Sequence, residues 1–538
     1  MFFVVVKGRR LVLHLVILLW TLGGVFSLWS WLTRPYPAPR IGIEGASAAL
    51  VEQLFGKEQI REIVLDSAPE LLIRLGDGKL DYLVELDTPT PGLISSYLGQ
   101  LVPAVVVSFF DERMEMDLEG LLSLIDREPH QVLVSDALSL PGFPWSNIPV
   151  QYLPSSAVVD QLQMEQGKVG VIPLQDRSPA VRVLPLSGVT PLQTNPPYPL
   201  SRSLYLSHPP ESLPQQLKDR VTKHQELQGI SPDPWGNQIT MLAVGDIMLD
   251  RDVKKVGLQK GWEHIFSEVA PRIRQADLAL ANLESPIGDK GHFINMFQAP
   301  PDAMAGVAYA GFDVVSLANN HTLDYHHAGM FETMRLLQEH GIEWVGAGKD
   351  IHEARTPLIK EVDGVKIGFL AYTEMWFVYS REPISWEATL DEPGVAPADV
   401  DMVVEDVKKL RDLVDCLIVT VHWGKEYVHE PTLEQQKLAR AAVDAGADLV
   451  LGHHPHVLQG IEFYKRGVIV YSMGNFVFDL NRPKTWETMI LEFSLSATGP
   501  LDMTVIPVYI FGVQPRILTG SHKDAVYRQI RDFSRQID

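Results

Sequence analysis

Ile239-Thr-Met-Leu-Ala-Val-Gly-Asp246 is a run of mostly apolar residues that ends in an acidic side chain. Asp448-Leu-Val-Leu-Gly-His-His-Pro-His456 repeats this arrangement with histidines, and Leu417-Ile-Val-Thr-Val-His422 repeats it with a single histidine. Short apolar runs bounded by turn residues are typical of buried strands. Such strands carry the polar residue that follows them to the edge of a sheet. These stretches therefore predict an α/β fold with a polar site.

Three further apolar runs end in the same way. Residues 277–281 lead to Asn282-Leu283-Glu284, residues 313–318 lead to Asn319-Asn320-His321, and residues 468–472 lead through Met473 to Gly474-Asn475-Phe476. Helical patterns at 264–274, 330–340, 400–413 and 433–445 separate these runs. Ligands of an α/β sheet bind beyond the carboxyl ends of its strands. The polar residues are therefore expected to meet in one site although they are far apart in the sequence.

The residues at the strand ends are of the kinds that bind metals. Asp and Glu supply anionic oxygens, Asn a neutral oxygen and His an imidazole nitrogen, a mixture that suits manganese, iron or zinc better than calcium or magnesium alone. Two ions a few ångströms apart need a bridging carboxylate, for which Glu284 is the candidate. Such a pair lowers the pKa of bound water and stabilises the oxygens of an in-line displacement. Taken alone, each motif is more often a turn or a cap. Independent turns, however, would not all choose metal-binding residues.

Taken together, these motifs resemble the CapA family of poly-γ-glutamate capsule biosynthesis proteins, also called PgsA. The family is a branch of the calcineurin-like metallophosphoesterases, and the likeness extends from about Gln238 to near the C-terminus. It implies an α/β/β/α sandwich, in which two sheets are flanked by helices on both outer faces. The matching motifs are Gly245-Asp-Ile-Met248, Asn282-Leu-Glu284, Asn319-Asn-His321, His422-Trp-Gly-Lys-Glu426-Tyr427, Gly452-His-His-Pro-His456 and Ser472-Met-Gly-Asn-Phe476.

The resemblance implies ligands for one or two divalent ions, manganese, iron or zinc. Glu284 would bridge the two ions, in the place where calcineurin-like enzymes have a bridging aspartate. The first ion would be bound by Asp246, Glu284 and His456. The second would be bound by Glu284, Asn320, His422 and His454.

The resemblance also assigns the catalytic roles, and it shows one departure from the pattern. His321 would be the general acid or would stabilise the transition state, and Glu426 would order His422 or contact the substrate. Calcineurin-like enzymes have Asp-x-His as their first motif, whereas this chain has Asp246-Ile-Met248. A thioether is a poor ligand for a hard divalent ion. A site with one metal therefore remains an alternative to a site with two.

Composition restricts the partners of the protein. The chain has 538 residues, 46% of them hydrophobic and 21% charged, and its formal net charge is -21. This length predicts more than one domain. An acidic surface repels phosphates and argues against a nucleic-acid partner, although a bound cation can still attract a polyanion locally. The single cysteine, Cys416, excludes an internal disulfide and is interpreted as a packed core thiol.

The N-terminus predicts a membrane anchor. Residues 11–32 contain no Asp, Glu, Lys or Arg, and about 20 such residues are enough to cross a bilayer as a helix. Lys7, Arg9 and Arg10 precede this run and favour a cytoplasmic N-terminus with the bulk of the chain extracytoplasmic. A cleaved signal peptide is the alternative. The length of the run and the lack of a small-x-small cleavage site favour a single-pass cell-membrane protein.

The region after the anchor predicts a second α/β domain. Strand-like runs at 41–44, 82–84, 101–109, 132–135 and 168–174 alternate with helical runs. Residues 168–174, 181–188 and 198–206 resemble the closing segment of phosphate-type periplasmic binding proteins. That resemblance implies an anion held near Ser47; the alternative is a binding-protein fold that serves only as a spacer or docking module. Several prolines at 209–234 indicate a linker.

These features divide the chain into five parts and leave two functions open. The first hypothesis is an anchored, metal-dependent hydrolase of capsule or cell-envelope polymer metabolism, acting on a phosphoester or on poly-γ-glutamate. The second is a non-catalytic component that exports or retains an anionic polymer within a membrane synthase or export complex. The predicted parts are a cytoplasmic N-terminus (1–10), a transmembrane anchor (11–33), a binding-protein-like domain (38–208), a linker (209–237) and a CapA-type domain (238–538).

Overall fold

A computed structural model describes residues 40–44, 62–66, 82–86, 94–208 and 237–537, with short gaps at 112, 114, 140–142, 147, 166, 190, 192–197, 376 and 379–383. The chain divides into two compact units, residues 1–98 with 203–228 and residues 99–202 with 229–538. The predicted anchor at 11–33, Ser47 and the predicted linker as far as residue 236 lie outside the described residues. Among the described helices, none is both long and apolar enough to cross a membrane. The domain boundaries given above remain predictions.

The N-terminal half contains two sheets, and the predicted strands are present in them. The first sheet has the order β2-β1-β3-β10-β4 and the second the order β7-β6-β8-β5-β9. Helices α4 (Leu118–Arg127) and α5 (Ser155–Met164) belong to the part with the second sheet. The strands are β1 (Arg40–Glu44), β2 (Glu62–Asp66), β3 (Tyr82–Leu86), β4 (Ile94–Leu101), β5 (Pro103–Ser108), β6 (Val132–Ser135), β7 (Gln151–Leu153), β8 (Val169–Pro173), β9 (Val181–Val183) and β10 (Arg202–His208).

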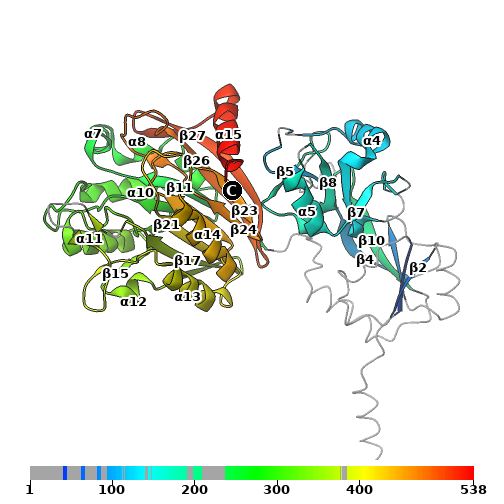
Figure 1. Cartoon of the computed structure of the whole chain (residues 1–538), viewed down its shortest axis with the longest axis horizontal. Coiled ribbons are helices and arrows are strands. Elements are labelled where there is room, and N and C mark those ends of the chain that lie inside the picture. Colours follow the sequence, from blue (N-terminus) through cyan, green and yellow to red (C-terminus); the bar gives the residue numbers. More distant parts are fainter. Residues whose placement is uncertain are drawn as a thin grey trace, which may run out of the picture. The chain divides into compact units, whose positions relative to one another are not determined.

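The C-terminal half is built on two larger sheets (Figure 1). The eight-stranded sheet has the order β14-β13-β12-β11-β26-β27-β28, with β25 also paired to β11. Its strands are β11 (Gln238–Ile247), β12 (Leu278–Leu283), β13 (Val314–Ser316), β14 (Glu343–Val345), β25 (Asn475–Val477), β26 (Glu487–Ser496), β27 (Gly499–Phe511) and β28 (Gln514–Ile517). The six-stranded sheet runs β16 (Leu358–Val362), β17 (Val365–Thr373), β21 (Cys416–His422), β22 (Leu449–His453), β24 (Gly467–Val470) and β23 (Ile461–Tyr464).

Alternation along the strands produces a layered core. Successive side chains of a strand point to opposite faces, so Met241 lies in the core shared with Ile418 and Leu449 of the other sheet, while Leu242 lies in a core lined by helices. On the six-stranded sheet, Val419 faces α13 and α14 in a third core. The C-terminal half therefore has the predicted order of helices, sheet, sheet and helices.

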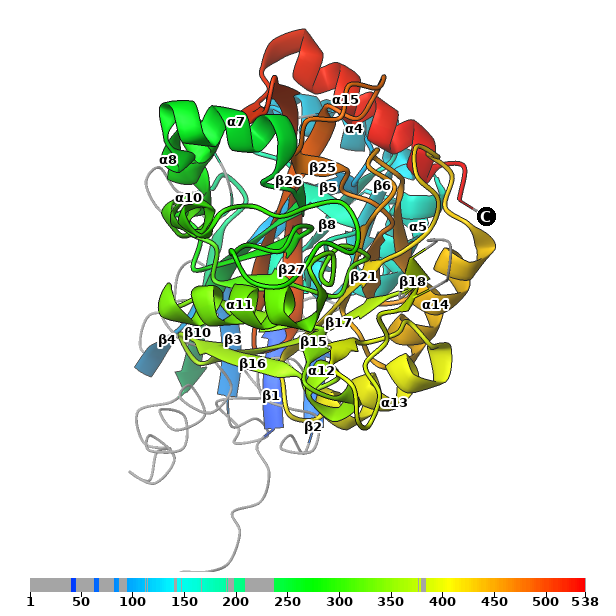
Figure 2. The same cartoon turned by 90° about the vertical axis from the view of Figure 1, so that its left-hand side faces the viewer.

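Helices cover the outer faces of both sheets, as Figure 2 also shows. The helix predicted at 264–274 is instead two short helices, because Pro271 lacks an amide hydrogen and begins a new helix. The helices of the eight-stranded sheet are α7 (Arg251–Lys260), α8 (Trp262–Phe266), α9 (Ala270–Ile273), α10 (Met304–Ala310) and α11 (His326–Glu339). Those of the six-stranded sheet are α12 (Ile351–Ala354), α13 (Val400–Arg411) and α14 (Leu433–Ala445), and α15 (Gly520–Ser534) follows the last strand.

Candidate metal centre

Three adjacent strands of the eight-stranded sheet contribute to the site. The first two each end at an acid, and the third leads into a loop. Strands β11, β12 and β13 pair in parallel, so their carboxyl ends lie at one edge. Asp246 stands at the end of β11 and Glu284 directly follows β12. Asn320 and His321 follow β13 in the next turn. The parallel register therefore explains why these residues meet.

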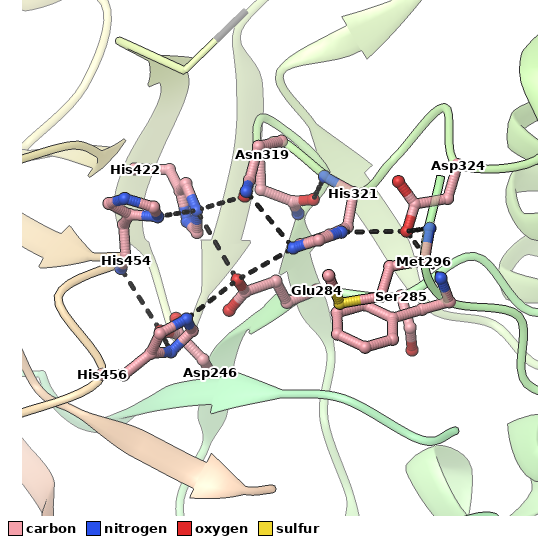
Figure 3. Close-up of polar contacts among 12 residues, drawn as sticks. Asp246, Glu284, Ser285, Met296, Asn319, His321, Asp324, His422, His454 and His456 are labelled. Atoms are coloured by element: carbon pink, nitrogen blue, oxygen red, sulfur yellow. Dashed lines mark hydrogen bonds and ion pairs between the residues drawn. The ribbon is translucent and has the colours of Figure 1, made fainter. Parts of the chain in front are cut away.

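The six-stranded sheet contributes the histidines. Strands β21 and β22 pair in parallel with His422 opposite His453, and His454 and His456 follow in the loop after β22. His454 and His456 have φ of 95° and 58°, a region that non-glycine residues adopt at a cost and that is found at functional sites. The imidazole of His456 is directed toward the two acids, and that of His454 toward His422 (Figure 3).

At two glycines, the backbone of a neighbouring segment comes so close that no side chain would fit. This close approach brings the strand ends together. A Cβ on Gly245 would lie 2.0 Å from the carbonyl oxygen of Gly474, and a Cβ on Gly452 would lie 2.0 Å from the carbonyl oxygen of Tyr471. Asp246 N–H donates to the carbonyl of Gly474 at 3.0 Å. Any larger residue at these two positions would separate the strands that carry the site.

Glu284 lies at the centre of the cluster and has no hydrogen-bond donor among the described residues. Its side chain is fully buried, and neither carboxylate oxygen accepts a hydrogen bond. Three imidazole nitrogens surround its Oε1, namely Nε2 of His422 at 3.7 Å, of His456 at 3.8 Å and of His321 at 3.9 Å. Two atoms that bind one ion, each about 2.1 Å from it, lie at most about 4.2 Å apart. His422 and His456 are therefore at the spacing of ligands that share a cation with Glu284, and His321 stands beside them.

A second set of atoms converges beside Glu284. Nε2 of His422 lies 2.8 Å from Oδ1 of Asn320 and 3.1 Å from Nδ1 of His454. With Oε1 of Glu284, which lies 3.7 Å from Nε2 of His422, these are two nitrogens and two oxygens around one point. These residues are those of the predicted second ligand set, Glu284, Asn320, His422 and His454, and their binding of one ion stays a prediction.

Asp246 has a fuller hydrogen-bond shell than Glu284. Its Oδ1 lies 2.9 Å from Nδ1 of His453 and accepts from Nδ2 of Asn282 at 2.9 Å. Its Oδ2 accepts from the N–H of His454 at 3.2 Å and lies 3.6 Å from Nδ1 of His456. Burial alone would raise the pKa of Asp246, but His453 and His456 hold that pKa well below its usual value. Its contacts with His453 and His456 therefore favour the ionised form of Asp246.

The charges of the site match a bound cation. Burial, followed by the charge of Asp246, raises the pKa of Glu284 well above its usual value. Burial lowers the pKa of His422 well below its usual value and that of His454 to about 3. Neutral imidazoles are the form that binds metal. A cation among these groups would also favour the ionised form of Glu284, so the residues fit a divalent ion.

The described residues contain two groups of three residues whose ligand atoms, within each group, lie within 4.8 Å of one another, and both groups include Glu284. One joins Glu284 to His454 and His456, and the other joins Glu284 to Asp246 and His422. The resemblance paired Asp246 with His456 and His422 with His454, so the grouping by distance crosses the predicted one. Both groupings have Glu284 as the shared ligand, and the division of the remaining ligands between two ions stays a prediction.

His321 is positioned by Asp324, a residue that the sequence did not single out. Oδ2 of Asp324 lies 2.9 Å from Nδ1 of His321 and accepts from the N–H groups of Met296 and Phe297 at 3.1 and 2.7 Å. The ring of Phe297 packs on His321, with 4.4 Å between the centroids. These contacts direct Nε2 of His321 toward Glu284 (Figure 3).

The structure places the other predicted residues as follows. Glu426 is exposed, and its charge contributes to raising the pKa of Glu284. It therefore lies at the rim and not among the ligands. Met248, at the position of the missing histidine, is fully buried in the core beneath helix α7. Its sulfur accepts the N–H of Asp250 at 3.0 Å, so it does not substitute for a ligand.

Residues behind the ligands are the part that sequence reasoning missed. His453 contacts Asp246 with its Nδ1 at 2.9 Å and lies behind that acid. Oδ1 of Asn475 lies 2.8 Å from Nδ1 of His456, which leaves Nε2 of that ring directed at Glu284. Asn475 belongs to the Ser472–Phe476 motif, but the sequence predicted no role for its side chain. The sequence feature that could have indicated Asp324 is its position three residues after His321.

Comparison with known proteins agrees with these motifs. The family profile described as bacterial capsule synthesis protein PGA_cap matches residues 240–480. The capsule biosynthesis protein CapA of Bacillus anthracis is 34% identical over 311 residues, which are 55% of this chain and 74% of the relative. The PGA biosynthesis protein CapA of Bacillus subtilis (strain 168) is 34% identical over 278 residues, 51% of this chain and 72% of the relative.

A comparison with solved structures gives a weaker likeness over part of the chain. An ABC-type phosphate transport receptor from Vibrio cholerae is 13% identical with a TM-score of 0.28, covering 35% of this chain and 96% of that protein. This is too weak to assign the binding-protein fold, which stays a prediction. Because a relative that is 34% identical is matched over 74% of its length and the capsule-synthesis profile matches residues 240–480, the chain belongs to the CapA family of capsule biosynthesis proteins.

Proposed function

We propose that this protein is a divalent-metal-dependent hydrolase of the calcineurin-like kind that acts in the metabolism of a capsule or another cell-envelope polymer. It acts outside the cytoplasmic membrane, to which the apolar segment at 11–33 anchors it. Its substrate is an anionic polymer such as poly-γ-glutamate or a phosphoester of the envelope. Partners in a membrane synthase or export complex are part of the same proposal.

The observation that carries the proposal is the environment of Glu284. A buried carboxylate without hydrogen bonds costs several kcal/mol when it is ionised, and natural structures accept such a cost mainly where another charge offsets it. Here three imidazole nitrogens lie 3.7–3.9 Å from one oxygen of this carboxylate. Both oxygens also lack hydrogen-bond partners among the described residues. A divalent cation would complete the charge balance and use these unsatisfied atoms.

The residues around the proposed cation have distinct tasks. Glu284, Asp246, Asn320, His422, His454 and His456 would hold one or two ions, of manganese, iron or zinc. A divalent ion bound there supplies Lewis-acid polarisation and activation of water.

His321 is the proton donor to the leaving group or stabilises the developing charge. Its Nδ1 contacts Asp324 at 2.9 Å and its Nε2 lies 3.2 Å from Nδ2 of Asn320, so Nε2 is the ring nitrogen on the side of the proposed ligands, where the substrate would bind. Asp324 thereby fixes the tautomer and the orientation of His321.

Glu426 stands at the exposed rim two residues past Gly424. From this place it can contact substrate without being a metal ligand.

A second function is supported by one departure from the enzyme pattern. Met248 stands where calcineurin-like enzymes have a histidine ligand, and its side chain is buried in the core. A site with this loss could retain or guide an anionic polymer without cleaving it. The alternative is therefore a non-catalytic component of polymer export or retention.

Metal content and turnover, measured together, separate the two functions. The full-length chain would be purified, reconstituted with manganese, and analysed for bound metal. Hydrolysis of poly-γ-glutamate and of a generic phosphodiester would be measured with and without a chelator. Bound metal with chelator-sensitive turnover is the expected result and identifies the substrate class. Bound metal without turnover of either substrate would favour the non-catalytic alternative, and absence of both metal and turnover would refute the metal-site proposal.

A further inference from the structure

Two arginines lie at the rim of the metal centre, and they differ in whether a carboxylate neutralises their charge. Arg251 packs over the rings of Phe297 and Phe478, at 4.9 and 5.5 Å from their centroids, and forms an ion pair with Asp479. Arg482 lies over the ring of Tyr427 at 4.2 Å. Among the described residues, no carboxylate pairs with the guanidinium of Arg482. Its positive charge is therefore available, whereas that of Arg251 is neutralised.

Arg482 is tied to the metal centre through its backbone. The carbonyl of Arg482 accepts from Oγ1 of Thr485 at 2.8 Å, and the carbonyl of Thr485 accepts from Nδ2 of Asn475 at 3.1 Å. Oδ1 of Asn475 in turn contacts Nδ1 of His456 at 2.8 Å. Three successive hydrogen bonds thus fix the turn that carries Arg482 relative to a predicted metal ligand.

The aromatic ring beneath Arg482 is fixed to the same loop. The N–H of Tyr427 donates to the carbonyl of Pro455 at 2.8 Å, and the ring of Tyr427 lies 6.0 Å from that of His456. Stacking on an aromatic face orders a guanidinium while leaving its N–H edge free to donate hydrogen bonds. Because the side chain is already ordered, it loses little entropy when a ligand binds.

The charge of the protein makes such a cation necessary for an anionic ligand. The chain has a net charge of -21, and Glu426 is exposed at the rim beside Tyr427. An oxyanion that approaches this rim meets repulsion unless a cation offsets it. A guanidinium offers two parallel N–H donors to a carboxylate or a phosphate. Arg482 has both the charge and the geometry for this purpose.

We propose that Arg482, held on the ring of Tyr427, binds an oxyanion of the substrate beside the metal centre. This inference rests on the proposed function, because it assigns a substrate contact to the same site. The oxyanion is a carboxylate of a γ-glutamyl chain or the phosphate of a phosphoester. Either group can accept two parallel N–H donors from a guanidinium. Arg482 thus determines substrate binding and is not a metal ligand.

The test compares four full-length proteins loaded with manganese: the wild type, R482Q, R482K and the control R466Q. Arg466 is an equally exposed arginine in the turn between β23 and β24. It precedes a strand that runs parallel to β22, so it lies at the edge of the sheet opposite the metal centre. Binding of a fluorescent γ-glutamate oligomer would be followed by anisotropy, and KM and kcat would be measured with a phosphodiester.

R482Q is expected to raise the Kd for the oligomer, or the KM for the phosphodiester, about fivefold to tenfold, with bound metal unchanged. R482K should have a smaller effect because it keeps the charge and loses the fork. R466Q should stay within about twofold of the wild type. The ligand that responds identifies the oxyanion. Added salt should weaken binding to the wild type more than to R482Q.

The outcomes separate this inference from the hydrolase proposal. If R482Q and R466Q have the same Kd and KM for both ligands, Arg482 binds no substrate oxyanion, whatever the turnover. If the wild type binds neither ligand, the inference is equally refuted. If the oligomer binds and R482Q weakens it while no turnover occurs, the role of Arg482 stands and the hydrolase proposal fails.

Discussion

Replacing Glu284 with glutamine tests the centre of the proposed metal site. The change keeps the shape of the side chain and removes its negative charge. Both carboxylate oxygens are buried without hydrogen bonds among the described residues, so the wild type without metal contains a destabilising acid. Burial, followed by the charge of Asp246, raises the pKa of Glu284 well above the ordinary value of 4.5. A group whose pKa is raised on folding contributes stability that is present at low pH and lost as pH rises toward the folded-state pKa.

The raised pKa of Glu284 also sets the size of the stability difference between the wild type and E284Q. Each pH unit between the ordinary and the folded-state pKa of Glu284 costs about 1.4 kcal/mol. In a chelator at neutral pH, E284Q is therefore expected to be more stable than the wild type by a few kcal/mol. Saturating manganese should offset this difference, since a ligand at 100 times its Kd stabilises the folded state by about 2.7 kcal/mol. At roughly 2 °C per kcal/mol, the wild type gains ~5 °C in Tm and E284Q gains none.

The assay is a pair of thermal melts, with chelator and with manganese, combined with elemental analysis of bound metal. E332Q is the matched control, because Glu332 is a buried glutamate whose Oε2 accepts the N–H groups of Asp289 and Lys290. It should lower Tm in both conditions and keep the manganese-induced rise. An undiminished manganese-induced rise and unchanged bound metal in E284Q would refute Glu284 as the shared ligand.

Three further changes test other parts of the site. H321A should keep bound metal and lose turnover, because His321 lies beside the ligands and is oriented by Asp324; loss of metal would make His321 a ligand. G452A should lower the free energy of unfolding by more than about 3 kcal/mol in chemical denaturation, because its Cβ would lie 2.0 Å from the carbonyl oxygen of Tyr471; a stable G452A protein would contradict the close approach. The pKa of His454 is lowered to about 3 by burial, so the unfolded state binds more protons between pH 3 and 6.5. In a chelator, stability should then fall as pH falls through this window, by up to about 1.4 kcal/mol per unit, and H454Q should reduce that slope.

The sequence was sufficient to identify most of the site because each ligand stands at the end of a strand. An apolar run that ends in Asp246, His422 or His454 is a local pattern, and the burial of such a run depends little on distant residues. The positions of the strands and most helices follow for the same reason. The helix at 264–274 was mispredicted because the pattern of apolar residues continues through Pro271, where the backbone cannot keep its hydrogen bonds.

The sequence by itself thus determined which residues were available as ligands and predicted that they would meet in one site. The tertiary structure alone decided how they pair. Asp246 contacts His453, 207 residues away, and Glu284 has no hydrogen-bond donor among the described residues, because the packing of the two sheets sets these distances. Asp324, Asn475 and Arg482 have their roles for the same reason. A side chain acts through what surrounds it in space, and contacts between distant segments cannot be deduced from local periodicity.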